Sequence, residues 1–142
     1  MPVVSICSQV RNQGEWMKEM IQSVCDQSFE DWELLIVDDG SKESLQPIVE
    51  SFNDKALGRI KFWRFEENKG VPVGTNHCLR HATGKYIGLI AADEVYWKDK
   101  LKVQVEYLEA NPKIGACWGM PGSGSFAGTF PLGPRPEIEQ NM

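Results

Sequence analysis

Two pairs of adjacent acidic residues in this sequence directly follow apolar runs. Asp38 and Asp39 come after the run LLIV, and Asp93 and Glu94 come after the run IGLIAA. Apolar runs of this kind are typical of strands buried on both faces, as in a parallel sheet covered by helices. Ligands bind in the crevice beyond the carboxyl ends of such strands. The two pairs therefore predict a site that holds a divalent cation and a nucleotide.

The first pair suits the nucleotide, and the second pair suits the cation. A carboxylate at Asp38 or Asp39 can accept a hydrogen bond from a base or a ribose. Asp93 and Glu94 are oxygen ligands of the kind that Mg²⁺ or Mn²⁺ takes together with substrate phosphates. Adjacent strand residues point to opposite faces, so both can bind one ion only if the strand has ended before them. Helix capping and solvated loop acids remain the alternative explanations.

Asn68, Lys69 and Gly70 predict a weaker anion site at the start of a helix, where Lys69 could contact a phosphate. A turn with Gly70 in a left-handed conformation explains the same residues. His77 and His81 have a spacing that could bind a metal, but no nearby Glu or Cys completes a ligand set. Surface or core histidines are the favoured interpretation.

Hydrophobic periodicity predicts the elements that position these residues. Helices are expected over residues 14–26, 43–52, 70–81 and 98–109, and strands over residues 3–7, 32–37, 60–65, 86–91 and 114–118. This alternation predicts an α/β fold with a mainly parallel sheet flanked by helices.

Composition excludes several classes of protein. The chain has 142 residues and a net charge of −5, which suits one domain and disfavours binding to nucleic acid or an anionic membrane. No apolar run approaches the ~20 residues of a membrane span, and no secretory signal is expected. P-loop, dinucleotide-binding and serine-hydrolase motifs are missing. Four widely spaced cysteines are expected to be reduced thiols of a cytosolic protein.

The composition changes after residue 119, where glycine and proline become frequent. We expect no regular element there until a helix begins at Pro136–Gln140. The predicted organisation is an α/β domain over residues 1–119 and a tail over residues 120–142 that leads towards a further half.

Taken in order, these pieces resemble the family-2 glycosyltransferases, which have the Rossmann-like GT-A fold that binds nucleotide-diphospho-sugars. The matching segments are VSI with VRN, IQSV with DQSF, ELLIVDDGS, ENKG, ATGKYI, ADE, and KL through LEANP, and they run from the N-terminus to about residue 119. The family moves a sugar from a nucleotide-diphosphate donor to an acceptor, usually with inversion and with Mg²⁺ or Mn²⁺.

The resemblance implies roles for individual residues. Val10 would lie against the base through its backbone, and Asp38 and Asp39 would recognise base and ribose. Gly70 and Asn76 fall in matching segments that complete the nucleotide site. Asp93 corresponds to the D-x-D acid closest to the metal and donor, and Glu94 to the acid that often follows it.

Three residues depart from the family pattern. Ala91 stands where the first acid of the D-x-D motif is usual, Gln9 replaces a common proline, and Thr75 stands where an arginine often precedes the asparagine matched by Asn76. The substitution at Ala91 leaves open a non-catalytic binding module with a degenerate fold. A nucleotidyltransferase, which also pairs carboxylates with a metal, is the third possibility.

No segment matches the family's acceptor-binding half. We therefore expect the general base to lie beyond the end of this chain, and the acceptor to be a glycan or a lipid-linked sugar. By analogy, the setting would be polysaccharide assembly in the cytoplasm, at the inner face of the membrane.

Overall fold

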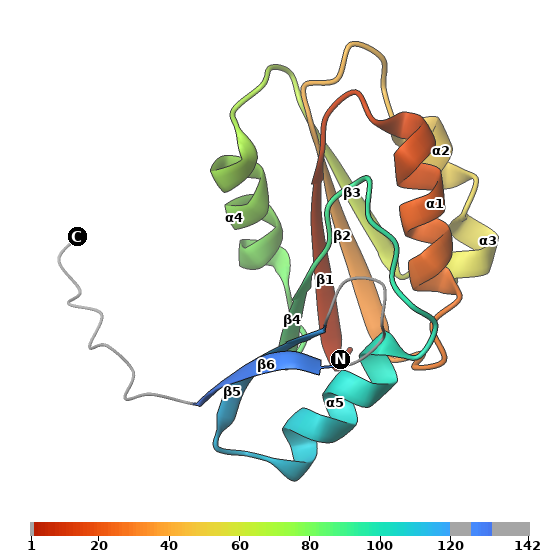
Figure 1. Cartoon of the computed structure of the whole chain (residues 1–142). Helices are drawn as coiled ribbons and strands as arrows, with labels where there is room; N and C mark the ends of the chain where they lie inside the picture. The colour runs from red at the N-terminus through yellow and green to blue at the C-terminus, as the bar shows by residue number, and fades with distance from the viewer. Residues whose placement is uncertain (1, 120–125, 132–142) are drawn as a thin grey trace, which may run out of the picture. The chain divides into compact units, whose positions relative to one another are not determined.

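The computed structural model describes residues 2–119 and 126–131, the latter as backbone only. The chain divides into two compact units, residues 1–98 and residues 99–142. This division does not coincide with the predicted boundary after residue 119. Figure 1 labels the helices and strands of both units.

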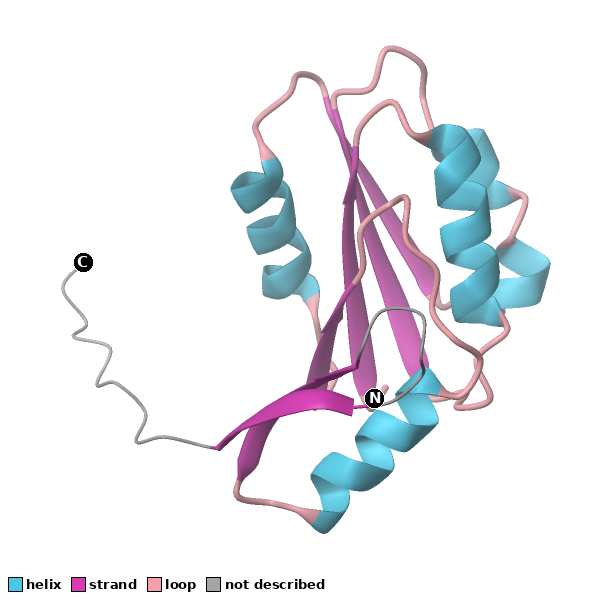
Figure 2. Cartoon of the chain, viewed as in Figure 1, coloured by secondary structure: helices cyan, strands magenta, loops and turns pink. Residues whose placement is uncertain are grey.

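The first unit is built on a four-stranded parallel sheet with strand order β3-β2-β1-β4. The predicted parallel sheet flanked by helices is therefore confirmed. Helix α4 covers one face, and α1, α2 and α3 lie on the other (Figures 1 and 2). The strands are β1 (Val4–Val10), β2 (Trp32–Asp39), β3 (Ile60–Phe65) and β4 (Tyr86–Leu89), and the helices are α1 (Gly14–Cys25), α2 (Gln46–Glu50), α3 (Asn53–Ala56) and α4 (Val71–His81).

The core of this unit lies around the two central strands. Every residue of β2 is buried, because β1 and β3 flank it and helices cover both faces. Helix α1 packs its apolar stripe inward, and its four buried residues are those that the helical spacing indicates: Met17, Met20, Ile21 and Val24. Periodicity thus predicted the helix, and the apolar stripe along it is the face that it buries.

Some boundaries differ from the prediction. Strand β1 continues through the polar Ser8 and Gln9 to Val10, because backbone pairing with β2 extends to the register pair Val10–Asp38. Strand β4 ends at Leu89 instead of residue 91. The helix expected over residues 43–52 is replaced by the shorter α2 and α3. Pro47 lacks an N–H and fits only the first helical turn, so α2 cannot begin much before it.

The second unit contains α5 (Lys100–Ala110) and an antiparallel pair of strands, β5 (Ile114–Gly119) and β6 (Phe126–Pro131). The expectation of no regular element between residue 119 and Pro136 is wrong for β6. Antiparallel strands need only a short connection, so a segment rich in glycine and proline can return beside β5. The helix expected at Pro136–Gln140 lies outside the described residues.

Within the described residues, no helix is long and apolar enough to cross a membrane.

Candidate functional site

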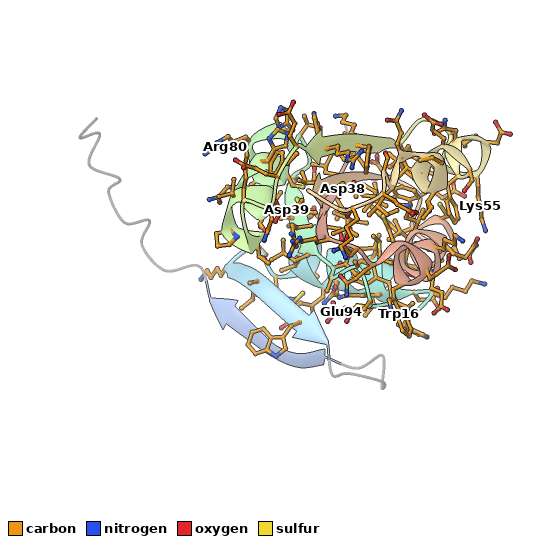
Figure 3. The ribbon with its side chains drawn as sticks, turned by 90° about the horizontal axis from the view of Figure 1, so that it is seen from above. Trp16, Asp38, Asp39, Lys55, Arg80 and Glu94 are labelled. Carbon is orange, nitrogen blue, oxygen red and sulfur yellow. The ribbon has the colours of Figure 1, made fainter. Side chains whose placement is uncertain are left out.

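The predicted site lies at the edge of the sheet where the parallel strands end. Val10 of β1 is in register with Asp38 of β2, and Asp39 is in register with Phe65 of β3. Figure 3 looks onto this edge and shows Asp38 and Asp39 near each other, with Glu94 separated from them in this view. The ends of three strands therefore bring a buried backbone and two carboxylates together.

Asp38 is a fully buried carboxylate with one oxygen left over. Its Oδ1 accepts a hydrogen bond from the Ser41 N–H at 2.9 Å. Its Oδ2 has no hydrogen-bond partner among the described residues; Arg64 Nε lies 3.5 Å away as an ion pair without hydrogen-bond geometry. Arg64 Nη2 in turn donates to the Ser41 carbonyl at 2.9 Å. Buried polar atoms are nearly always paired, so this oxygen is suited to accept a hydrogen bond from a ligand.

Asp39 is also fully buried, but both of its carboxylate oxygens accept hydrogen bonds within the chain. Oδ1 accepts from the Lys69 N–H at 2.7 Å, and Oδ2 accepts from the Gly70 N–H at 3.0 Å and from Gln9 Nε2 at 2.9 Å. Asp39 therefore holds the loop before α4 against β1 and β2. These two amides bind Asp39, so they do not form the open phosphate site that the sequence suggested.

Two glycines allow this arrangement of loops. Gly70 has φ +90°, the positive φ that the alternative interpretation of residues 68–70 requires of a glycine, but its ψ of 158° lies outside the left-handed helical region. Gly40 has φ +70°, and a Cβ built there would lie 2.5 Å from the Glu67 carbonyl carbon. The loop after β2 and the loop after β3 thus touch through backbone, and a side chain at Gly40 would separate them.

A second tie joins the loops that follow β1 and β2. The Asn12 N–H donates to Ser41 Oγ at 2.8 Å, and the Lys42 N–H donates to Asn12 Oδ1 at 2.9 Å. Asn12 has φ +56°, a conformation that asparagine tolerates better than most residues. Sequence reasoning assigned no site role to Asn12, Ser41 or Arg64. The sequence feature that could have indicated a role for Asn12 is its position two residues after the strand that ends at Val10.

Asp93 and Glu94 lie in a turn after β4. The Glu94 N–H donates to the Ala91 carbonyl at 3.1 Å, and Glu94 Oε2 accepts from the Ala91 N–H at 3.0 Å. Ala92 is buried, whereas Asp93 is exposed and makes no hydrogen bond or ion pair within the described part of the chain. Because β4 has ended at Leu89, strand alternation no longer separates the two acids.

The residues after β4 fit a cation that binds together with a diphosphate. No three His, Cys, Asp or Glu residues of the described chain are grouped as a metal site. One or two carboxylates are what Mg²⁺ usually takes from a protein, with phosphate oxygens and water completing its shell. Asp38 lies near the end of β2, and the turn of Asp93 and Glu94 follows β4. Because β1 lies between these two strands, β2 and β4 are two strand spacings apart, or about 10 Å.

The remaining predicted residues are placed as follows. Val10 is buried, and Gly70 lies in the loop held by Asp39. Asn76 is exposed on α4, two residues from each of Gly74 and Cys78, which are the buried residues of that helix. A two-residue step turns a helix by about 200°, so Asn76 points away from the sheet and is not brought together with the other residues.

His77 and His81 belong to an aromatic cluster on β3 and α4. Their ring centroids lie 4.9 and 4.7 Å from that of Trp63, and His81 Nδ1 contacts the His77 carbonyl oxygen at 2.8 Å. Burial, with the neighbouring charges of His81 and Arg80, lowers the pKa of His77. This packing agrees with the interpretation of the two histidines as structural.

Comparison with known proteins identifies the family. The model of "Glycosyl transferase family 2" matches residues 5–140. The chain belongs to glycosyl transferase family 2. It is 35% identical over 107 residues to the teichuronic acid biosynthesis glycosyltransferase TuaG of Bacillus subtilis, covering 75% of this chain and 42% of TuaG. It is 34% identical over 108 residues to the glycosyltransferase EpsE of the same organism, covering 76% of this chain and 39% of EpsE. The chain thus spans less than half the length of these relatives.

Solved structures confirm the GT-A fold. S. aureus TarS 1-349 in complex with UDP-GlcNAc has a TM-score of 0.74 and 24% identity, covering 86% of this chain and 36% of that one. The mannosyltransferase PcManGT from Pyrobaculum calidifontis, in complex with GDP-Man and Mn²⁺, has a TM-score of 0.74 and 23% identity, covering 87% and 37%.

Proposed function

We propose that this chain is the donor-binding portion of a glycosyltransferase that moves a sugar from a nucleotide-diphosphate donor to a glycan or lipid-linked acceptor, with inversion and with Mn²⁺ or Mg²⁺. One observation carries the proposal. Asp38, a buried carboxylate with one oxygen that has no hydrogen-bond partner among the described residues, lies at the sheet edge where the exposed carboxylate of Asp93 follows β4.

In this proposal Asp38 and its surroundings bind the nucleoside. Asp38 Oδ2 accepts a hydrogen bond from a base N–H or a ribose hydroxyl, which supplies the hydrogen bond that this buried acceptor lacks among the described residues. Val10 offers backbone beside it, and Asp39 keeps the neighbouring loop in place. This assigns recognition to Asp38 and positioning to Asp39.

Asp93 would hold the divalent cation, with the remaining ligands supplied by the donor and by water. When bound, such a cation neutralises charge on the departing diphosphate. Preorganised charge of this kind is often the largest contribution to catalysis. Lys69 lies exposed at the same edge, with its Nζ 5.0 Å from the centre of the Phe65 ring, and could meet a phosphate.

The related proteins support a nucleotide-sugar donor and a divalent cation for this chain. The TarS complex contains UDP-GlcNAc, and the PcManGT complex contains GDP-Man with Mn²⁺. The name of TuaG places that relative in teichuronic acid biosynthesis, which supports polysaccharide assembly as the setting of the reaction proposed here.

Calorimetry tests the proposal. The chain is titrated with UDP, UDP-GlcNAc and GDP-mannose, first with Mn²⁺ and then with EDTA. We expect binding that requires Mn²⁺ and that Asp93→Asn weakens by more than about tenfold, or ~1.4 kcal/mol. Asp54→Asn, which changes an exposed acid of α3, serves as the matched control and should bind as the unchanged chain does.

Two results would contradict the proposal. Absence of binding for every nucleotide in both conditions would oppose a donor site in this chain. Binding that is equal in EDTA and insensitive to Asp93→Asn would oppose the role of the metal. That second result would favour a binding module without metal chemistry, the alternative that Ala91 suggests, since Ala91 brings no carboxylate to the turn.

A further inference from the structure

The loop that carries Asp93 is closed at its base by Tyr96. The Tyr96 hydroxyl donates to the Leu89 carbonyl at 2.9 Å, and the Tyr96 N–H donates to Ser23 Oγ of α1 at 3.0 Å. Burial, together with the charge of Glu94, raises the pKa of Tyr96, so its hydroxyl stays protonated and remains a donor. The last residue of β4 and the segment after the loop are therefore fixed to each other.

Within this loop the two acids differ in what they bind. Glu94 contacts Ala91 twice, through its backbone N–H and through side-chain Oε2. Asp93 has no such contact within the described residues, and it projects from a turn whose preceding residue, Ala92, is buried. If Glu94 gave Oε2 to a cation instead of to the Ala91 N–H, the turn would lose this side-chain hydrogen bond and keep only the one between the Glu94 N–H and the Ala91 carbonyl.

We propose that Glu94 is a positioning residue, which holds the turn of residues 91–94 closed so that Asp93 alone presents its carboxylate to the cation. This inference rests on the proposed function and changes one assignment, because the family resemblance makes Glu94 a metal ligand. Side chains that orient a metal ligand typically change metal affinity about 10–100-fold when they are removed. We expect the loss of the Glu94 side chain to change the affinity for the cation by a factor in this range.

Two substitutions separate a positioning role from a ligand role. Glu94→Gln keeps an acceptor oxygen at the same reach and removes the charge, whereas Glu94→Ala removes both. Asp93→Asn is compared in parallel. Glu30→Ala, at an exposed glutamate before β2 and so at the opposite edge of the sheet, controls for the loss of an acidic side chain.

Each variant is measured in two ways. Hydrogen exchange of the Ala91 amide, followed by NMR in the ligand-free chain, reports whether the turn is closed. Calorimetry with UDP and Mn²⁺ reports the cation-dependent affinity. We expect Glu94→Gln to retain slow exchange and to bind UDP with Mn²⁺ within about threefold of the unchanged chain. Glu94→Ala should exchange faster and bind about tenfold more weakly.

The remaining outcomes decide the inference. Asp93→Asn should lose the Mn²⁺-dependent binding and keep the slow exchange of Ala91. The inference is overturned if Glu94→Gln loses Mn²⁺-dependent binding as Asp93→Asn does while the Ala91 amide stays protected, since Glu94 would then be a ligand. If the unchanged chain binds no UDP, the proposed function fails for this chain. The exchange experiment then still decides whether Glu94 closes the turn, and unchanged exchange in Glu94→Ala refutes it.

Discussion

At the scale of single residues, Asp38 and Asp39 are adjacent aspartates with different roles. Successive strand residues point to opposite faces. Asp39 lies on the face of Leu35 and Val37, which pack with Cys78 of α4, and it reaches the loop at the start of that helix. Asp38 lies on the other face beside Arg64. The carboxylate of Asp39 therefore holds a loop in place, whereas that of Asp38 has an oxygen that can accept a hydrogen bond from a ligand.

Exchanging each acid for its amide should separate stability from binding. Asp39→Asn replaces an acceptor oxygen by an NH₂ group that faces N–H donors, so we expect a loss of about 1–3 kcal/mol in the free energy of unfolding. Asp38→Asn keeps an acceptor for the Ser41 N–H and should change stability by less than about 1 kcal/mol. It should nevertheless weaken nucleotide binding. Urea denaturation and calorimetry measure the two effects; a larger destabilisation by Asp38→Asn would contradict the division of roles.

The sequence predicted the acids of this edge but not their partners. Apolar runs that stop at Asp38 and Asp93 are local signals, visible within a few residues. The bonds from Lys69 and Gly70 to Asp39 join positions about thirty residues apart. Such pairings depend on strand register and loop path, which hydrophobic periodicity does not specify. For the same reason, Arg64 could be placed beside Asp38 only once the register of β3 was known.

At the scale of elements, the buried carboxylate of Glu33 joins several elements at the edge of the sheet opposite to the candidate site. Glu33 of β2 accepts hydrogen bonds from Ser5 of β1 at 2.6 Å and from Lys61 of β3 at 2.8 Å. It also accepts from the backbone N–H and the hydroxyl of Thr83, both at 2.9 Å. Glu33 thus links three strands to the connection between α4 and β4.

This network makes stability depend on pH. Burial alone would raise the pKa of Glu33, but the hydrogen bonds from Lys61, Ser5 and Thr83 lower it from 4.5 to about 2. A carboxyl group whose pKa is lower in the folded state stabilises the fold above its unfolded pKa, and this contribution is lost as the pH falls. Glu33→Gln should therefore cost about 2 kcal/mol at pH 7, allowing for the partial exposure of Lys61.

The difference between the unchanged chain and Glu33→Gln should shrink as the pH falls from 4.5 towards 2. Urea denaturation at a series of pH values measures it, and Glu30→Gln, at an exposed glutamate on the same edge, is the control. A difference that stays constant from pH 7 to pH 2 would show that charge on Glu33 does not contribute.

The elements themselves were predicted where one face is continuously apolar. Helix α1 and strand β2 follow this rule, and both lie close to the predicted bounds. The prediction was wrong where pairing or a single residue outweighs the pattern. Backbone pairing carries β1 through Ser8 and Gln9, and it forms β6 from a segment of weak periodicity. Pro47 delays α2 beyond its predicted start.

At the scale of the whole chain, burial differs between the two units. The first is centred on β1 and β2, which are almost wholly buried. The second has few buried side chains among its described residues, with Leu101 and Val105 of α5 the most enclosed. Local stability follows the number of buried apolar contacts, so the units should open with different free energies.

A core substitution in each unit tests this independence. Ile36→Ala in β2 removes a fully buried side chain and should cost about 2–5 kcal/mol. If the units open separately, it should accelerate amide hydrogen exchange over residues 2–98 and leave residues 99–119 unchanged. Val105→Ala should accelerate exchange over residues 99–119 and leave residues 2–98 unchanged. The effect should be smaller than that of Ile36→Ala, since fewer atoms are removed. Mass spectrometry of native-state exchange resolves both regions. Acceleration over both units by either variant would mean that they open together, and the donor edge would then depend on α5 for its stability.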